Sequence, residues 1–340
     1  MGRRAILIGL SCLLLTTLFA SQASGLVAQT KDGSVIAWGC GPAPGPCRVP
    51  ASAKQGVTAI AAGVGHSLAL KRGGSVIAWG CRPSGDLGQC RVPASARSGV
   101  EAISANQTSS LALTNDGSVV AWGCGRLSNV GQCSVPSSAK GGVTAIAAGN
   151  YHSLALKNGA VIAWGCGTTK DGTNFDFGQC RVPNSATSGV IAIAAGFHHS
   201  LALKKDGSVV AWGCRPGYDY GQCSVPAAAK SDVTAIAAGT DHSLGLKKDG
   251  SVIAWGCRRD DNYGQCNVPA DARHGVTAIA AGAYHSLALK QDGSVIAWGC
   301  KDPTHFGINV GQCRIPTSAK HRVSAISAGA FHNLVLKSGQ

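Results

Sequence analysis

Short segments of alternating hydrophobic and small polar residues run along the chain, and residues 57–93 show one complete unit. Val57 to Ala62 alternates around small side chains, His66 to Lys71 forms a second apolar segment, and Ser75 to Trp79 forms a third. Gln89 to Val92 adds a short fourth segment. Segments of this length, rich in Val and Ile and bounded by Gly and Pro, indicate β-strands. Each unit therefore predicts a four-stranded antiparallel sheet.

A turn dipeptide separates the second and third segments of nearly every unit. It reads Gly73-Gly74, Asp116-Gly117, Asn158-Gly159, Asp206-Gly207, Asp249-Gly250 and Asp292-Gly293. These residues accept the positive φ angles that tight hairpin turns require. The dipeptides predict hairpins on one face of the molecule. The loops between strands one and two, and between strands three and four, then emerge on the opposite face.

The unit recurs seven times, each copy carrying a variant of Val-[Ile/Val]-Ala-Trp-Gly-Cys. Successive tryptophans are 41 to 48 residues apart, at Trp38, Trp79, Trp122, Trp164, Trp212, Trp255 and Trp298. A period near 43 residues is typical of one propeller blade. The chain begins with a Trp hairpin at residues 34–38 and ends with an inner strand pair at residues 323–337. The prediction is an all-β, seven-bladed β-propeller closed by pairing of its N- and C-terminal segments.

The two ends of the chain raise separate questions. Arg3 and Arg4 precede the apolar stretch Ala5 to Phe19, and small residues follow, so residues 1–25 are predicted to be a signal peptide. A retained N-terminal anchor is the alternative, and no membrane partner is expected for the propeller at residues 26–340. Residues 26–31 also resemble a second strand and would duplicate Asn333 to Lys337. One of the two must lie outside the blade, and the pattern does not decide which.

Fourteen cysteines follow the predicted signal peptide, two in each repeat. One follows the Trp-Gly and the other begins the fourth segment, giving the pairs Cys40-Cys47, Cys81-Cys90, Cys124-Cys133, Cys166-Cys180, Cys214-Cys223, Cys257-Cys266 and Cys300-Cys313. Facing residues of antiparallel strands lie within reach of a disulfide. Zinc is the competing interpretation, but the chain has no Cys-x-x-Cys. One disulfide per blade is predicted, together with secretion through an oxidising compartment.

Several motifs resemble a known repeat family. They are Ser98-Gly99-Val100, Val135-Pro136, the run from Ala147 to Lys157, and Val161 to Gly165. These units resemble regulator-of-chromosome-condensation repeats, and more closely the secreted bacterial β-lactamase inhibitory proteins of the second type. The aromatic position of those inhibitors is matched at Tyr151, Tyr284 and Phe331. It is not matched at Gly65, Thr108, His198 and Asp241, and the cysteines depart from the family pattern.

The aromatic residues fall in the two loop sets expected on one face. Outside residues 1–25, the phenylalanines and tyrosines are Tyr151, Phe175, Phe177, Phe197, Tyr218, Tyr220, Tyr263, Tyr284, Phe306 and Phe331. The Cys-bounded loops also vary in length and content while the hairpin side hardly changes. Diversified loops on a constant scaffold are typical of recognition surfaces, where aromatic rings often dominate binding. These ten residues are the predicted partner-binding site; the alternative is that they cover loop backbone and plug the channel mouth.

Other candidate sites follow the repeat and point to structure. The histidines His66, His152, His199, His242, His285 and His332 occupy one turn per blade, so each is expected to bond its own turn and no metal is predicted. Asn106-Gln107-Thr108 is a glycosylation sequon in an aberrant repeat, where Asn106 replaces the usual Gly and Ser109 the usual His. No catalytic constellation stands out.

The chain has a net charge of +14, and many of its basic residues recur at equivalent positions of the hairpin face. They include Lys71, Lys157, Lys204, Lys247 and Lys290, and also Lys54, Lys140, Lys230 and Lys320. A basic ring suits polyanions such as acidic glycans, and the alternative is a solvated face that gives solubility. Nucleic acid is not expected, because no aromatic residues accompany these charges.

The sequence therefore predicts a secreted, monomeric, non-catalytic propeller that needs no cofactor and binds a protein through its aromatic loops. The family resemblance implies a secreted hydrolase, such as a β-lactamase, as one partner class. Glycan binding is a second hypothesis, because Tyr beside Asp also suits sugars. A hydrolytic enzyme is the third.

Overall fold

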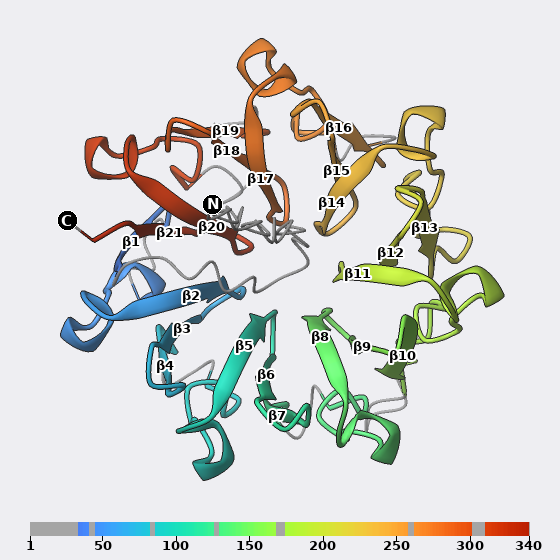
Figure 1. Ribbon diagram of the computed structural model, residues 1–340, viewed down its shortest axis with the longest axis horizontal. Helices are drawn as coiled ribbons and strands as arrows, with labels where there is room; N and C mark the ends of the chain where they lie inside the picture. The colour runs from blue at the N-terminus through green and yellow to red at the C-terminus, as the bar shows by residue number, and fades with distance from the viewer. Residues whose placement is uncertain are drawn as a thin grey trace, which may run out of the picture.

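The computed structural model describes residues 33–40, 45–81, 86–125, 129–167, 174–257, 262–300 and 310–339, which form seven three-stranded antiparallel sheets around a central axis (Figure 1). The inner strands are β2 Val57–Ala62, β5 Val100–Ala105, β8 Val143–Ala148, β11 Val190–Ala195, β14 Val233–Ala238, β17 Val276–Ala281 and β20 Val323–Ala328. The middle strands are β3 Ser67–Lys71, β6 Ser109–Thr114, β9 His152–Lys157, β12 Ser200–Lys204, β15 Ser243–Lys247, β18 Ser286–Lys290 and β21 Asn333–Lys337. The outer strands are β1 Ser34–Trp38, β4 Val76–Trp79, β7 Val119–Gly123, β10 Ala160–Gly165, β13 Val209–Trp212, β16 Val252–Trp255 and β19 Val295–Trp298. The predicted all-β, seven-bladed fold is confirmed.

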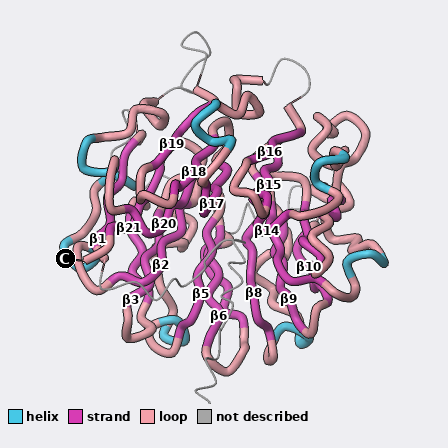
Figure 2. Tube along the Cα trace, turned by 45° about the horizontal axis from the view of Figure 1, so that its top comes forward, coloured by secondary structure: helices cyan, strands magenta, loops and turns pink. Residues whose placement is uncertain are grey.

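Single helical turns of 3-10 type connect the blades and lie toward the outside of the molecule (Figure 2). They are η1 Gly45–Cys47, η2 Ala51–Ala53, η3 Ala94–Ala96, η4 Ser137–Ala139, η5 Asn184–Ala186, η6 Ala227–Ala229, η7 Ala270–Arg273 and η8 Thr317–Ala319. From η2 onward each begins after a proline, which fixes the extended entry of the chain. In the described ranges no helix is long and apolar enough to cross a membrane. The predicted signal peptide lies outside the described residues.

The ring is closed by the two ends of the chain. β1 pairs antiparallel with β21, placing Val35 opposite Leu336, and β21 pairs in turn with β20. Figure 1 shows this blade, in which the first and last strands lie side by side. Closure by the terminal segments is therefore confirmed. Asn333–Lys337 occupies the second-strand position, and residues 26–31 lie outside the described residues.

The hairpins differ in part from the prediction. At Asn158-Gly159 both residues have positive φ, 52° and 73°, and two residues join β9 to β10. In the Asp-Gly hairpins only the glycine is left-handed, as at Gly207 with φ 82°. There the Asp206 carboxylate accepts hydrogen bonds from the Ser208 backbone N–H and hydroxyl at 2.9 and 2.6 Å. The aspartate therefore stabilises a longer turn with its side chain.

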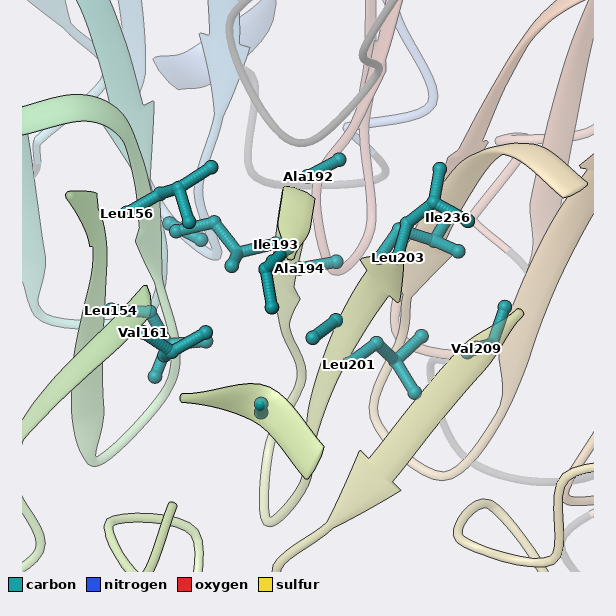
Figure 3. Packing of buried hydrophobic residues seen from close by; sticks show 14 of the residues in the cluster. Leu154, Leu156, Val161, Ala192, Ile193, Ala194, Leu201, Leu203, Val209 and Ile236 are labelled. Carbon is teal, nitrogen blue, oxygen red and sulfur yellow. The ribbon is translucent and has the colours of Figure 1, made fainter. Parts of the chain in front are cut away.

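The hydrophobic core lies between neighbouring blades. In one cluster Leu154 of β9 and Ile193 of β11 pack with Leu201 of β12, and none of these side chains is exposed (Figure 3). Equivalent clusters fill the other blade contacts, and the seven tryptophans at the ends of the outer strands are each 7% exposed. Because each blade buries its apolar face only against the next, the closed ring is the unit that completes the core.

The predicted fourth strand is wrong, since Gln89 to Val92 forms no strand. The Gln89 carbonyl accepts a hydrogen bond of 2.9 Å from the Trp122 indole N–H of the next blade. Its side-chain Oε1 accepts from the Leu87 N–H at 2.7 Å, which folds the segment into a turn. These bonds direct the segment to the following blade, so it does not pair with β4. The same Trp-to-Gln bond recurs at Gln132, Gln179, Gln222, Gln265 and Gln312.

All seven predicted cysteine pairs are disulfide-bonded, with Cα–Cα separations of 5.9 to 6.1 Å. The sulfur atoms are therefore not zinc ligands. In each pair the first cysteine follows an outer strand, and the second belongs to the segment bonded to the next blade's tryptophan. Each disulfide thus links one blade to the segment docked on its neighbour, on the face of the variable loops.

Six buried histidines form a second set of links between blades. His66 Nε2 lies 2.9 Å from Ser110 Oγ of the next blade, and His152, His199, His242 and His332 make the same contact with Ser200, Ser243, Ser286 and Ser67 at 2.9 to 3.1 Å. His285 Nε2 lies 2.6 Å from Asn333 Oδ1, which only accepts, so Nε2 carries the proton. The expectation that each ring bonds its own turn is wrong. Each ring lies over the glycine of that turn, but its Nε2 bonds to the next blade.

One blade departs from this pattern at two positions together. Ser109 stands where the others have His, and Asn106 where they have Gly. A Cβ on the equivalent Gly63 would lie 2.6 Å from His66 Cε1, so a histidine ring and a side chain do not fit there together. The Asn106 Nδ2 instead donates to the Ala148 carbonyl of the next blade at 3.0 Å. The amide replaces the missing histidine link.

This interpretation predicts strong coupling between the two positions. The single change Ser109→His should destabilise the protein by about 1 to 3 kcal/mol, because the ring meets Asn106. Adding Asn106→Gly should recover most of that loss, since the new histidine can then donate to Ser153, the counterpart of Ser110. Urea unfolding of both single variants and the double variant measures the coupling free energy. Additive effects would show that the two departures are unrelated.

Candidate aromatic binding site

The two loop sets that carry the aromatic residues share one face. Tyr151, between β8 and β9, stacks on Phe175 of the Cys166–Cys180 loop with ring centroids 3.9 Å apart. Tyr263, in the loop closed by Cys257 and Cys266, meets Tyr284, between β17 and β18, edge-on at 5.2 Å. Loops that precede the middle strand therefore touch loops that follow the outer strand. The predicted strand directions, and the common face that depends on them, are confirmed.

Six rings form one continuous group, which we call the aromatic cluster: Tyr151, Phe175, Phe177, Phe197, His198 and Tyr218. The ring centroid of Phe177 lies 4.0 Å from that of His198 and 4.7 Å from that of Tyr218. The centroids of His198 and Phe197 are 4.3 Å apart. The cluster spans the blade of β8–β10 and the blade of β11–β13. Five members were predicted from sequence and His198 was not. The sequence did contain an indication of His198, because it occupies the same turn position as Tyr151 and Tyr284.

Local hydrogen bonds hold the loops that present the cluster. Gln179 Oε1 accepts from the Phe177 N–H at 2.6 Å, and Gln179 Nε2 donates to the Phe175 carbonyl at 2.7 Å. Gln222 Nε2 likewise donates to the Tyr218 carbonyl at 2.7 Å. Because these glutamines also bind the tryptophans of the next blades, the loops are anchored directly to the propeller core.

Exposure differs sharply across the cluster. Phe177 and His198 are each 8% exposed, whereas Tyr218 is 45% exposed. Among the described residues, Tyr218 and Ile191 are the exposed large hydrophobic side chains, and Ile191 lies at the start of β11, on the hairpin side. Tyr218 is thus an exposed ring resting on a packed aromatic floor. Such a ring can insert into a partner with little loss of conformational freedom.

Charged groups lie at the margin of the cluster. The Arg181 guanidinium is 2.9 Å from the Asp176 carboxylate. The backbone N–H of Gly178, with a further contribution from Arg181, holds the pKa of Asp176 below its ordinary value. Burial lowers the pKa of His198 to about 4 and raises the pKa of Tyr151. At neutral pH the floor is therefore uncharged and the margin carries an ionised carboxylate.

The remaining predicted residues lie outside this group. Tyr263 and Tyr284 form a separate pair farther along the ring, and Tyr220 is half-buried in the loop after β13. Phe331 and Tyr284 line a central cavity of about 330 Å³, whose walls are the inner strands. Phe306 lies outside the described residues. Which of these residues contact a partner stays a prediction.

Asn106 lies on the same face, at the mouth of the central cavity. Its Nδ2, the atom that would carry a glycan, donates to Ala148 as described above. Glycosylation of Asn106 stays a prediction. In the described ranges, no three His, Cys, Asp or Glu side chains gather as a metal site.

The family model of the Regulator of chromosome condensation (RCC1) repeat matches residues 57–89, 190–222, 233–265 and 276–302. No curated protein matches the chain in sequence. These four matches lie in four of the seven blades, so part of the chain carries repeats similar to those of this family.

Solved structures resemble the chain in fold. Prp20p from Saccharomyces cerevisiae, studied for its binding to Gsp1p and histones, aligns with a TM-score of 0.64 at 22% identity, over 91% of this chain and 92% of its own. Human WBSCR16 aligns with a TM-score of 0.62 at 18% identity, over 91% of this chain and 99% of its own. The ectodomain of the Arabidopsis thaliana receptor kinase ACR4 aligns with a TM-score of 0.53 at 20% identity, over 80% of this chain and 89% of its own.

Proposed function

We propose that this chain is an extracellular, non-catalytic propeller that binds a protein partner through the aromatic cluster, with Tyr218 at the centre of the contact. The observation that carries the proposal is the 45% exposure of Tyr218 above the nearly buried Phe177 and His198. Tyrosines with a rigid apolar surround are frequent hot spots of protein interfaces. The ionised Asp176 and the neighbouring Arg181 then form the polar rim that such interfaces have.

The disulfides support the extracellular setting. Seven bridges persist in oxidising compartments and are rare in the cytosol. They also fix both ends of the variable loops, which lowers the entropy lost when a partner orders them. The RCC1-type neighbour Prp20p, described as binding Gsp1p and histones, supports the use of this fold as a protein-binding platform.

The buried histidines favour a binding role over catalysis. His152 and His199 are fully buried, bonded to serines of the next blade, and neutral at neutral pH because burial lowers each pKa to about 3. They are therefore engaged in holding the blades together. The partner class implied by the sequence resemblance is a secreted hydrolase such as a β-lactamase, and it is the first class to test.

The test compares capture of secreted proteins by three forms of the immobilised protein. Tyr218→Ala should weaken binding of the partner by about thirtyfold, which corresponds to the roughly 2 kcal/mol typical of a hot-spot ring. Ile191→Thr is the matched control. It removes an exposed apolar side chain from the hairpin side and restores the residue found at Thr58, Thr144, Thr234 and Thr277. Affinities measured by surface plasmon resonance quantify the difference.

Equal binding by Tyr218→Ala and the unchanged protein would refute the role of the cluster. Purified β-lactamases, assayed for inhibition with the same three forms, test the hydrolase class separately. A glycan array distinguishes the remaining alternative, because sugar binding lost in Tyr218→Ala, without any protein partner, would make the cluster a lectin site.

A further inference from the structure

The face opposite the aromatic cluster is strongly cationic. It is formed by the hairpins between middle and outer strands and by the crossings to the next blade, and its described residues include sixteen basic and seven acidic side chains. The basic residues are Lys54, Lys71, Arg72, Arg97, Lys140, Lys157, Lys204, Lys205, Lys230, Lys247, Lys248, Arg273, Lys290, Lys320, Arg322 and Lys337. The acidic ones are Glu101, Asp116, Asp206, Asp232, Asp249, Asp271 and Asp292. We call this surface the basic face.

Six of the lysines are held in equivalent positions around the ring. The ammonium group of Lys247 donates to the carbonyls of Ala228 and Ser231, at 2.9 and 2.5 Å. Lys290 does the same with Asp271 and His274 at 2.9 and 2.5 Å. Lys71, Lys157, Lys204 and Lys337 bind the corresponding turns of their own blades. These charges are fixed by the main chain, so little side-chain entropy is lost when an anion approaches them.

A second set of cations is exposed to solvent. Lys54, Lys140, Lys230 and Lys320 each follow a single helical turn, and Lys205 and Lys248 lie at the tips of hairpins. The aspartates between them are tied into their turns, as at Asp249, whose Oδ1 accepts from the Ser251 N–H and hydroxyl at 2.9 and 2.6 Å. The basic face thus presents one set of cations held by the main chain and a second set exposed to solvent, while aspartates such as Asp249 are held at their turns.

We infer that the basic face binds a linear acidic polysaccharide, one that carries sulfate or carboxylate groups at regular intervals. Repetition of the held lysine in six of the seven blades lets a flexible polyanion contact several lysines in many registers, so that weak contacts add together. Multiple cations also raise the local concentration of such a polymer. The inference is independent of the proposed protein-binding function, because it uses the opposite face.

Three observations favour a polysaccharide over other anionic partners. The described tyrosines and phenylalanines lie in the loops of the other face, so stacking of single-stranded bases has no platform here. Ile191 is the large apolar side chain exposed on this side of the described structure, which is too little to anchor the face in a membrane. Seven disulfides fit an extracellular setting, where acidic polysaccharides are available.

Heparin, used as a sulfated probe, tests the inference. The unchanged protein should bind it at 0.15 M NaCl, with a logarithmic salt dependence that reports several ion contacts, on the order of four. The variant Lys205→Gln/Lys248→Gln/Lys320→Gln should bind at least tenfold more weakly and lose about three ion contacts from the salt slope. The matched control, Arg48→Gln/Arg91→Gln/Arg314→Gln, removes the same charge beside the Cys loops and should bind as the unchanged protein does.

Three results would overturn the inference. One is that heparin is not bound at 0.15 M NaCl. Another is that the control variant loses as much affinity as the lysine variant, because net charge and not the basic face would then govern binding. The third is tighter binding of duplex DNA, or of vesicles containing phosphatidylserine, than of heparin at the same salt concentration. Circular dichroism of both variants establishes that each retains the fold.

Discussion

Lowering the pH from 7 to 5 is expected to remove most of the propeller's stability. Six histidines are fully buried between blades, and burial lowers their pKa to about 3 or about 4 from an ordinary value of 6.5. The unfolded chain therefore binds more protons than the folded chain between pH 6.5 and about 3. Stability is full above pH 6.5 and declines as the pH falls through this window.

The expected loss is large because the sites repeat. At pH 5 each buried histidine costs about 2 kcal/mol, so the six together approach about 12 kcal/mol, comparable to the whole stability of a typical domain. The protonated form is also poorly accommodated. The Nδ1 atoms of His66, His152, His199, His242 and His285 have no hydrogen-bond partner in the described structure, and a proton added there would lack an acceptor.

The groups around these histidines do not stabilise the protonated form enough to offset its desolvation. Neighbouring histidines lower one another's pKa further, as His66 and His285 do at His332. The charge of Asp86 raises the pKa of His66, and the hydrogen bond to Asn333 raises the pKa of His285. Both effects are smaller than the lowering caused by desolvation. The carboxylates of Asp116, Asp206, Asp249 and Asp292 have lowered pKa values through bonds to Ser or Thr, and their protonation acts in the same direction below pH 4.

Urea unfolding followed by tryptophan fluorescence at pH 7.5, 6 and 5 measures this effect, since all seven tryptophans are nearly buried. The double variant His152→Gln/His242→Gln is the control, because glutamine keeps a donor but does not titrate. Its stability should depend on pH less steeply, with about two fewer protons taken up on unfolding at pH 5. A midpoint of the unchanged protein that stays constant from pH 7.5 to 5 would refute the assignment.

Reduction of the seven disulfides is expected to have an effect of similar size. The bridged segments are short, with cysteines 7 to 14 residues apart. Each bridge stabilises by about 2.5 to 3 kcal/mol through the entropy it removes from the unfolded chain. Reduction should therefore lower the urea midpoint strongly, and blade contacts on the face of the variable loops should loosen first. Hydrogen exchange of the loop amides, measured with and without reductant, reports that order.

Single bridges provide the comparison. Cys166→Ala/Cys180→Ala opens the longest bridged segment and Cys40→Ala/Cys47→Ala the shortest, and on chain entropy alone the two losses should differ by only about 0.5 kcal/mol. The second pair also ties the ring-closing β1 to its neighbour. A clearly larger loss there would mean that the bridge contributes through closure of the ring. A reduced protein with an unchanged midpoint would contradict the stabilising role altogether.

The repeat made the fold readable from sequence. Seven Trp-Gly-Cys units at a nearly constant period fixed the number of blades, and the incomplete units at the two ends indicated closure. The cysteine pairs followed because both members occur once in every unit. These features depend on periodicity, which a single chain with internal repeats displays by itself.

The contacts between blades were harder to predict because they depend on three-dimensional placement. Gln89 to Val92 looks like a strand by composition, yet its carbonyl binds Trp122 of the next blade. The histidines were expected to bond locally, since nothing in the spacing shows that His66 reaches a serine 44 residues away. The joint replacement of Gly by Asn106 and of His by Ser109 is a sign of such a contact. It can be interpreted only once the structure shows that the histidine ring of the other blades lies against the glycine.

The aromatic site was predictable in location and not in detail. Strand parity placed Tyr151 and Phe175 on one rim, and their stacking agrees with it. Which rings stay exposed is decided by loop conformation, and most of them cover one another. Tyr218 differs because its loop lifts the ring above Phe177, a result of packing that composition does not show.

The pairing of β1 with β21 also bears on the order in which the molecule is assembled during synthesis. The strand translated first among those of the ring must wait, with a hydrogen-bonding edge unfilled, until the last strand has left the ribosome. Its partner is almost the whole chain length away, so this single contact dominates the entropic cost of reaching the finished topology. The other six sheets are complete within themselves, and a nascent row of blades can therefore form before its ends meet.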